Sequence, residues 1–270
     1  MNWYLVRDKE REGWMNMAID AVMVENPPAL PVLRFYSWNP PAVSLGLNQT
    51  NEALNRSEFQ KRGLDLVRRP TGGRAVYHGN EITYSVIIPE KNLLYSHTTH
   101  ELYCMISKAL AFGLKHAGID AEIMRNKSGD AVRAKSNLEC FSSTARYEIK
   151  YNGRKLVGSA QRRMASAVLQ HGSVLLEDSQ EILKNLFNGR KQPNGSKRYK
   201  DDNINSDIVS ANLDRHTIID SIVRGFENEL NCVFADFDGY DTYIENIRSL
   251  KKVFSIYSAL ENSVPAEIRE

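Results

Sequence analysis

The sequence predicts an α+β fold, with a mixed β-sheet core flanked by helices and a helical C-terminal tail. Strand-like and helical segments are interspersed along the 270 residues, without the strict strand–helix alternation of a doubly wound sheet. The clearest hairpin has Asn152-Gly153 between two alternating runs, which is the strongest short-range signal for a two-residue β-turn. Hydrophobic residues make up 42% of the chain, as expected for a globular protein with a substantial core.

The first half of the chain predicts five short strands and three helices. A helical apolar pattern starts at Asn16 and ends before Pro27-Pro28, because the residue before a proline disfavours helical geometry. Gly63 and Gly118 are the C-terminal glycines of the next two helices. The expected strands are 3–6, 32–36, 42–45, 64–69 and 81–88, and the expected helices are 16–25, 51–63 and 98–117.

The second half begins with a short strand at 121–124 and a polar loop at 126–137. The hairpin around Asn152-Gly153 follows, and its second strand carries Lys155; another strand is expected at 168–176. Residues 188–202 are polar and basic, and apolar residues do not recur among them at helical or strand spacing, as is typical of a linker. Beyond the linker we expect helices at 214–230 and 243–260, with a brief strand or loop at 233–238. The chain therefore divides into a domain at 1–190 and a helical segment at 203–270 packed on it.

Composition excludes several classes of protein. The net charge of +2 gives no electrostatic case for nucleic acid binding. Three cysteines at unrelated spacings indicate neither a disulfide framework nor a metal site, and they favour a reducing compartment. The charged N-terminus does not resemble a signal peptide, and no apolar run reaches membrane-spanning length. We expect a cytoplasmic protein.

A loop with paired glycines, Gly72-Gly73, is the first candidate binding segment. It follows a strand and is surrounded by Arg68, Arg69 and Arg74. Glycines permit positive φ and close approach of the backbone to a ligand, and arginines bind phosphate or carboxylate. The loop matches neither a P-loop nor a dinucleotide-binding fingerprint. From the residues alone, a glycine-rich turn with solvated arginines is an equally good interpretation.

The second candidate segment holds Cys140, in a polar loop upstream of Lys155. A thiol reacts as its thiolate, and a neighbouring ammonium would lower its pKa. A solvated strand lysine is the competing interpretation. His78 and His171 are also candidates, although a lone histidine is more often a hydrogen-bonded structural residue than a catalytic one. No His/Cys/Asp grouping has the spacing of zinc ligands, so no metal is expected.

Several separated motifs, taken together, resemble one family. They are R-R-P-T-G-G-R-A-V-Y-H, G-R-K-L-V-G-S-A-Q-R-R and L-Q-H-G-S-V-L-L, with N-M-A-I-D and R-F-Y-S-W-N-P-P-A-V-S-L-G nearer the N-terminus. In this order, over about residues 2–180, they are similar to the lipoate–protein ligase/octanoyltransferase family, which is related in fold to biotin protein ligases. Arg74 and His78-Gly79 stand where ligases usually carry a third glycine and a His-Asp pair. Cys140-Phe141 resembles the loop of the cysteine-dependent octanoyltransferases.

The resemblance implies acyl transfer without a cofactor. The donor would be octanoyl-acyl carrier protein, and the acceptor a lysine of a lipoyl domain or of the glycine-cleavage H protein. Cys140 would form a thioester acyl-enzyme, and Lys155 would stabilise the thiolate and later orient or deprotonate the acceptor lysine. The resemblance further implies a backbone oxyanion site, an acyl tunnel and an arginine rim. The substrate-binding residues that would make them are Arg68, Gly72, Gly73, Arg74, Val76, His78, Gly158, Ser159, His171 and Gly172.

Three alternatives stay open at this point. An ATP-dependent lipoate–protein ligase would use ATP and Mg²⁺, with Lys155 holding the phosphate and Cys140 dispensable. An amidotransferase would move the acyl group between lipoyl proteins by the same chemistry. A non-catalytic module that binds carrier protein would show no transfer at all. We expect a monomer in each case.

Overall fold

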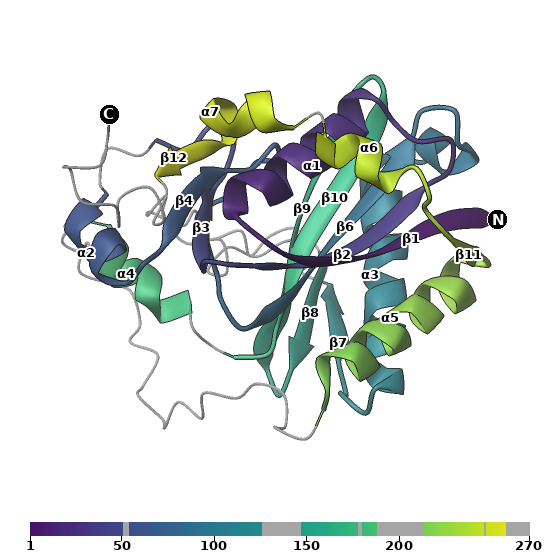
Figure 1. The fold of residues 1–270 in the computed structure, drawn as a ribbon. Helices are drawn as coiled ribbons and strands as arrows, with labels where there is room; N and C mark the ends of the chain where they lie inside the picture. Colours follow the sequence, from purple (N-terminus) through teal and green to yellow (C-terminus); the bar gives the residue numbers. More distant parts are fainter. Residues whose placement is uncertain (51–53, 126–146, 178–179, 188–212, 246, 258–270) are drawn as a thin grey trace.

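The computed structural model describes residues 1–50, 54–125, 147–177, 180–187, 213–245 and 247–257. Most of these residues are organised around an eight-stranded mixed sheet (Figure 1). Its strand order is β11 (Val233–Asp236), β1 (Asn2–Arg11), β2 (Val32–Trp38), β6 (Glu81–Pro89), β10 (Ala167–Leu175), β9 (Arg154–Arg163), β8 (Tyr147–Tyr151), β7 (Glu122–Arg125).

A smaller sheet lies beside the large one, with the order β12 (Ser255–Tyr257), β4 (Asp65–Arg68), β3 (Ala42–Leu45), β5 (Val76–His78). Parallel and antiparallel pairs occur in both sheets: β1 is parallel to β2 and β11, and β3 is parallel to β4. The helices are α1 (Gly13–Glu25), α2 (Arg56–Lys61), α3 (Thr99–His116), α4 (Leu183–Leu186), α5 (Arg215–Leu230), α6 (Tyr240–Glu245) and α7 (Lys251–Phe254). The predicted α+β class with a mixed sheet is confirmed.

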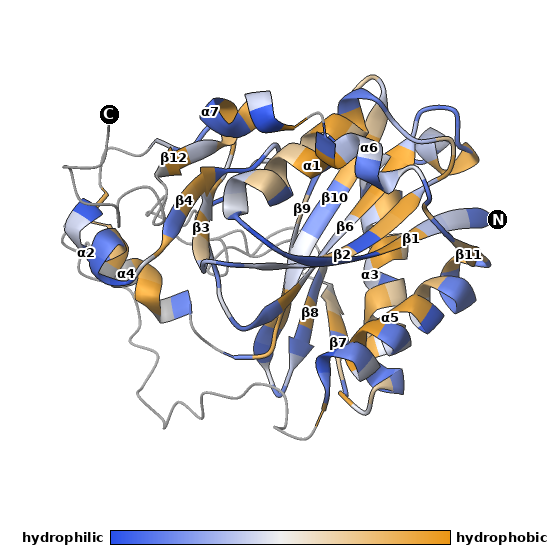
Figure 2. Ribbon diagram, viewed as in Figure 1, coloured by the Kyte–Doolittle hydropathy of each residue, from blue (hydrophilic) through white to orange (hydrophobic). Residues whose placement is uncertain are grey.

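Helices α3 and α5 cover one face of the large sheet and lie against each other (Figure 1). Their backbones touch where each helix has a glycine. A Cβ atom on Gly113 would lie 2.4 Å from Ile222 Cα, and one on Gly225 would lie 2.2 Å from the Ala109 carbonyl oxygen. Alternating hydrophilic and hydrophobic bands along α5 (Figure 2) match a helix with one buried face. Helix α1 packs on the opposite face of the sheet.

Local sequence signals predicted the helix ends and the hairpin well. Thr98 and Glu101 form a complete capping box at the start of α3, and Gly118 follows its end with a φ of 85°. Asn152 and Gly153 both have positive φ, of 50° and 74°, as a tight β-hairpin turn requires. The hairpin of β8 and β9 is therefore confirmed.

Three expected elements differ from the structure. Strand β1 continues through the charged residues to Arg11, because its backbone stays paired with β2 as far as Arg11 and Trp38. Helix α2 is shorter than 51–63, since it starts at Arg56 after the N-cap Asn55. The helix expected at 243–260 is wrong: α6, a 3₁₀ turn, α7 and strand β12 occupy its described part.

In its described residues, 213–245 and 247–257, the C-terminal segment is a mixture of helices and strands packed on the rest of the molecule. Strand β11 extends the large sheet beside β1, and β12 pairs with β4 in the small sheet. A free sheet edge offers backbone donors and acceptors that outweigh the modest helical preference of this segment. No helix in the described parts of the chain is long and apolar enough to cross a membrane.

The outer edge of β5 is covered by one side chain. The Gln180 amide accepts from the Tyr77 backbone N–H at 3.0 Å and donates to the Tyr77 carbonyl at 2.8 Å. It therefore makes the two hydrogen bonds that a neighbouring strand would make at this position.

Candidate active site

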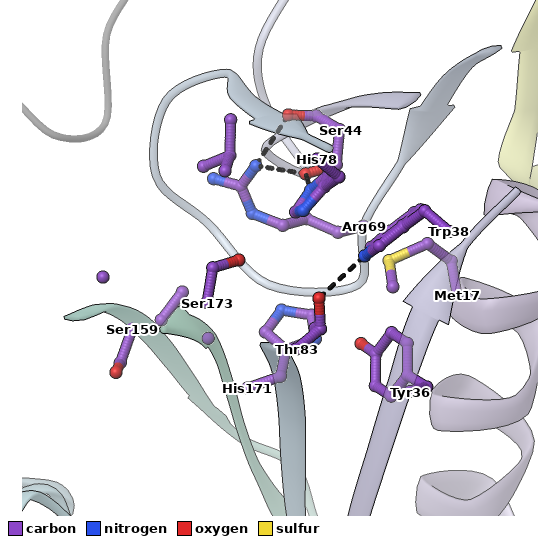
Figure 3. Close-up of a pocket in the computed structure, with 14 residues that line it drawn as sticks. Met17, Tyr36, Trp38, Ser44, Arg69, His78, Thr83, Ser159, His171 and Ser173 are labelled. Carbon is purple, nitrogen blue, oxygen red and sulfur yellow. Dashed lines mark hydrogen bonds between the residues drawn. The ribbon is translucent and has the colours of Figure 1, made fainter. Parts of the chain in front are cut away.

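A pocket lies between the two sheets and α1 (Figure 3). Its walls combine residues from β2, β3, β5, β6, β9, β10, α1 and the glycine-rich loop. Six of the residues predicted from the sequence line it: Val76, His78, Gly158, Ser159, His171 and Gly172. The other lining residues are Met17, Tyr36, Trp38, Ser44, Arg69, Thr83, Ala160 and Ser173.

His78 is buried and held on three sides. Its Nδ1 lies 2.6 Å from Glu81 Oε1, and its Nε2 lies 2.7 Å from Ser44 Oγ. The ring stacks on Trp38, with centroids 3.9 Å apart. A carboxylate only accepts hydrogen bonds, so Nδ1–H is the donor to Glu81. In the neutral imidazole, Nε2 then accepts from the Ser44 hydroxyl.

His171 is the second buried histidine of the pocket. Its Nδ1 lies 3.2 Å from Asp20 Oδ2, and its Nε2 lies 2.6 Å from Thr71 Oγ1. Burial lowers the pKa of His171, and the nearby Asp20 carboxylate offsets this only in part. The ring is therefore neutral near pH 7. It donates to Asp20 and accepts from Thr71, and so fixes the start of the glycine-rich loop.

Asp20 extends this chain of contacts across α1 to β1. Arg34, which is fully buried, donates to Asp20 at 2.9 Å and to Asp8 at 2.8 Å. Burial alone would raise the pKa of Asp8, but the hydrogen bond from Arg11 and the charge of Arg34 lower it to about 2. The pKa of Asp20 is likewise lowered: burial opposes this, and the hydrogen bond from His171 and the Arg34 charge prevail.

The arginines of the glycine-rich loop bind backbone carbonyls. Arg68 donates to the carbonyls of Gly46, Leu47 and Gln49 at 2.8–3.0 Å. Arg69 donates to the carbonyls of Ser44, Gly72 and Arg74, at 2.6–2.9 Å, and is only 4% exposed. Arg68 therefore holds the segment that follows β3, and Arg69 holds the glycine-rich loop. The sequence suggested instead that both face an anionic substrate or partner.

The loop also depends on a glycine that the sequence analysis did not select. A Cβ atom on Gly46 would lie 2.0 Å from the Gly73 carbonyl oxygen, so β3 and the loop are in backbone contact there. Gly73 has a φ of 97°, which favours glycine. Gly72 is exposed, and a Cβ atom there would meet nothing within 4 Å.

Two further arginines fix neighbouring segments. Arg162 donates to the Pro70 carbonyl at 2.8 Å, and Arg163 donates to the carbonyls of Tyr95 and His97. Arg74 is half-buried at the end of the glycine-rich loop.

Lys155 is outside the pocket lining but on the same face of the large sheet. It pairs with Lys150 across the hairpin, next to the pair Ile149–Val157, which belongs to the core under α3. Side chains alternate along β8, so Lys150 faces away from the core that holds Ile149, toward the pocket side. The register shifts by a bulge at Leu156, which brings Lys155 to the same side as Lys150. Lys155 Nζ lies 3.7 Å from Glu148 Oε1, and Lys150 Nζ lies 3.5 Å from Glu148 Oε2. Cys140 falls outside the described residues, so its pairing with Lys155 stays a prediction.

Asp20 and Glu81 are the site residues that sequence reasoning missed. Both are charged, at most 1% exposed, and bonded to a pocket histidine. A signal did exist for Asp20, because it interrupts the apolar run M-A-I-D-A-V-M-V of α1. Within the described residues, no group of three or more His, Cys, Asp or Glu side chains could hold a metal ion.

Comparisons with known proteins extend these observations. A family model, the lipoyl protein ligase A/B catalytic domain, matches residues 12–227. The octanoyltransferase LipM of Anoxybacillus flavithermus is 35% identical over 266 residues, covering 93% of this chain and 94% of that protein. LipM of Clostridioides difficile is 34% identical over 256 residues, covering 92% and 94%.

Solved structures with the same fold include lipoate-protein ligase A bound with ATP, with a TM-score of 0.69 and 21% identity over 93% of this chain and 95% of that one. A bi-partite lipoate protein ligase from Thermoplasma acidophilum, described with its E2 lipoyl domain, has a TM-score of 0.67 and 19% identity over 93% and 92%. These likenesses confirm the fold predicted from the motifs. The matches to the family model and to the LipM proteins cover most of the chain, and the chain therefore belongs to the lipoyl protein ligase A/B family and, within it, to the octanoyltransferases, a group of acyltransferases.

Proposed function

We propose that this enzyme moves an octanoyl group from octanoyl-acyl carrier protein to a lysine of a lipoyl-accepting protein, in lipoate biosynthesis. The observation that carries the proposal is the identity of about 35% with LipM octanoyltransferases over more than nine-tenths of both chains. The acceptor would be a lipoyl domain or the glycine-cleavage H protein. No cofactor is required, because a thioester donor is already activated for transfer.

Cys140 is the proposed acyl carrier. Its thiolate would attack the thioester carbonyl, so that a new sulfur–carbon bond forms and the carrier-protein thiolate leaves and takes up a proton. The amine of the acceptor lysine would then attack the acyl-enzyme. The amide bond forms, the Cys140 thiolate is released, and the amine loses a proton.

Lys155 is the proposed partner of that thiolate. An ammonium close to a thiol favours its ionised form. Lys155 suits this role because its side chain is only 13% exposed, lies on the pocket face of the sheet and is close to the Glu148 carboxylate. Glu148 would orient the ammonium.

The pocket is the proposed site of the acyl chain. Met17, Tyr36, Trp38 and Val76 give it apolar walls, and each methylene that leaves water contributes about 0.8 kcal/mol. The Asp20–His171–Thr71 contacts hold the glycine-rich loop, whose backbone N–H groups would stabilise the oxyanion. One such donor is typically worth about 3 kcal/mol.

Intact-mass measurement tests the acyl-enzyme directly. The protein is mixed with octanoyl-acyl carrier protein without ATP, and we expect an adduct with the mass of one octanoyl group. Cys140→Ala should abolish the adduct, whereas Cys104→Ala, at a thiol on α3, should keep it. The absence of an adduct, together with lipoate attachment that requires ATP, would overturn the proposal in favour of a ligase.

A further inference from the structure

The pocket contains a second arrangement with the chemistry of a nucleophile. Ser44 on β3, His78 on β5 and Glu81 on β6 form a continuous hydrogen-bonded chain of hydroxyl, imidazole and carboxylate. The two distances, 2.7 and 2.6 Å, lie within the range for strong hydrogen bonds. Ser44 and His78 line the pocket, and Figure 3 shows both at one end of it, next to Arg69.

The proton positions in this chain favour reaction at the serine. Glu81 accepts from His78 Nδ1–H, so in the neutral imidazole it is Nε2 that faces the Ser44 hydroxyl proton as a base. The Arg69 guanidinium donates to Ser44 Oγ at 3.1 Å and would stabilise negative charge developing on this oxygen. Nucleophile, base and orienting acid are thus in the order that activates a serine.

The orienting carboxylate is itself fixed. Glu81 Oε1 accepts hydrogen bonds from Thr83 Oγ1 at 2.6 Å and from Ser173 Oγ at 2.7 Å, in addition to His78. Glu81 is 1% exposed, Ser44 1% and His78 5%. Because all three side chains are buried and Ser44 and His78 line the pocket, we expect a substrate to reach them through the proposed acyl site.

We propose that Ser44 is a second acylatable residue and that this pocket hydrolyses activated medium-chain acyl esters through it. The Ser44 oxygen bonds to the acyl carbon, the ester oxygen leaves, and His78 Nε2 takes the Ser44 proton and passes it to the leaving group. Water then attacks the acyl-serine while His78 takes a proton from the water. Ser44 leaves, regains that proton, and the carboxylic acid is released. This activity goes beyond octanoyl transfer and does not involve Cys140.

The first test is labelling with an alkyl fluorophosphonate, followed by peptide mapping of the wild-type protein. We expect the label on Ser44, and at least about 100-fold slower labelling in His78→Gln, because the serine then lacks its base. Ser96→Ala is the control: this serine does not line the pocket, and its hydroxyl donates to the Leu93 carbonyl at 2.7 Å. A label elsewhere than Ser44, or a rate indifferent to His78→Gln, would overturn the proposal.

The second test measures p-nitrophenyl octanoate hydrolysis in the Cys140→Ala protein, where a cysteine thioester cannot form. Hydrolysis should persist there and disappear in Cys140→Ala/Ser44→Ala, with circular dichroism to verify folding of both. Hydrolysis that survives loss of Ser44 would contradict the proposal. This assay uses neither carrier protein nor Cys140. A negative result would therefore overturn the role of Ser44 without contradicting the proposed octanoyl transfer.

Discussion

Lys155 and Lys150 give a direct comparison at the level of single residues. Both ammonium groups lie within 4 Å of the same carboxylate, Glu148, and face the same side of the sheet. Only Lys155 is proposed to act on the Cys140 thiol. We expect Lys155→Met to lower kcat/KM for octanoyl transfer by about 100-fold or more, and Lys150→Met by less than about tenfold. Equal losses of kcat/KM in the two variants would contradict a specific role of Lys155, since any positive charge near Glu148 would then support transfer equally.

The burial of His171 determines how the free energy of unfolding depends on pH. Its pKa is lowered in the folded protein from the ordinary value of 6.5. Above pH 6.5 the ring is neutral in both the folded and unfolded states, so it adds no pH dependence there. As the pH falls below 6.5, the unfolded chain binds a proton that the folded protein excludes, and the free energy of unfolding falls by at most about 1.4 kcal/mol per pH unit.

Urea denaturation between pH 5 and 8 checks this expectation. The fall in unfolding free energy should be smaller in His171→Gln than in the wild-type protein. His116→Gln, which changes an exposed histidine at the end of α3, serves as the control. An unchanged slope in the His171 variant would show that the ring titrates alike in the folded and unfolded chains.

The sequence predicted the two pocket histidines but not their partners. His78 and His171 stood in recognisable motifs, whereas Asp20 is separated from His171 by 151 positions in the chain. Contacts across such distances depend on how sheets and helices come together, which local patterns do not record. Arg69 is a related case: its charge predicted a ligand contact, but its guanidinium donates to two carbonyls of its own loop and to the Ser44 carbonyl of β3.

At the level of elements, the contact between β3 and the glycine-rich loop makes Gly46 and Gly72 behave differently. Gly46→Ala places a Cβ atom 2.0 Å from the Gly73 carbonyl oxygen, so the loop must move. We expect it to lower octanoyl transfer by more than about tenfold, since small displacements at a site are costly. Gly72→Ala should fold normally, because its Cβ atom would have open space. Thermal denaturation and transfer assays of both variants test the difference, and a fully active Gly46→Ala protein would refute it.

Elements with strong local signals were predicted well, and those set by distant partners were not. The capping box and Gly118 define α3 without reference to other parts of the chain, and Asn152-Gly153 does the same for the hairpin. In contrast, β12 exists because β4 offers a free edge. The apolar spacing of its residues is compatible with a helix, which explains the wrong prediction at 243–260.

For the molecule as a whole, the boundary expected after residue 190 does not separate two cores. Ile218, Ile222 and Phe226 of α5 are fully buried in the same cluster as α3 and the large sheet. We therefore infer that α5 folds together with α3 and the large sheet. A chain ending at residue 212 should lose cooperative thermal unfolding and bind hydrophobic dyes, because one face of α3 would be exposed. A sharp unfolding transition in that truncated chain would contradict the inference.

The charged contacts centred on Arg34 also connect distant parts of the chain. Tyr240, on α6, accepts a hydrogen bond from Arg34 Nε at 2.8 Å and donates one to Asp8 at 2.5 Å. Through Asp20 the same arginine reaches His171 in the pocket. The C-terminal segment therefore belongs to the framework that positions the site.

The Gln180 amide at the edge of β5 has a consequence for association with other chains. An uncovered edge strand is a template on which an extended peptide, or a second copy of the protein, can add a strand. Here the backbone N–H and C=O of Tyr77 are already occupied by a side chain of the same molecule. The proposed acceptor protein would therefore be recognised at this edge through side chains and shape, and addition of a strand at Tyr77 is blocked.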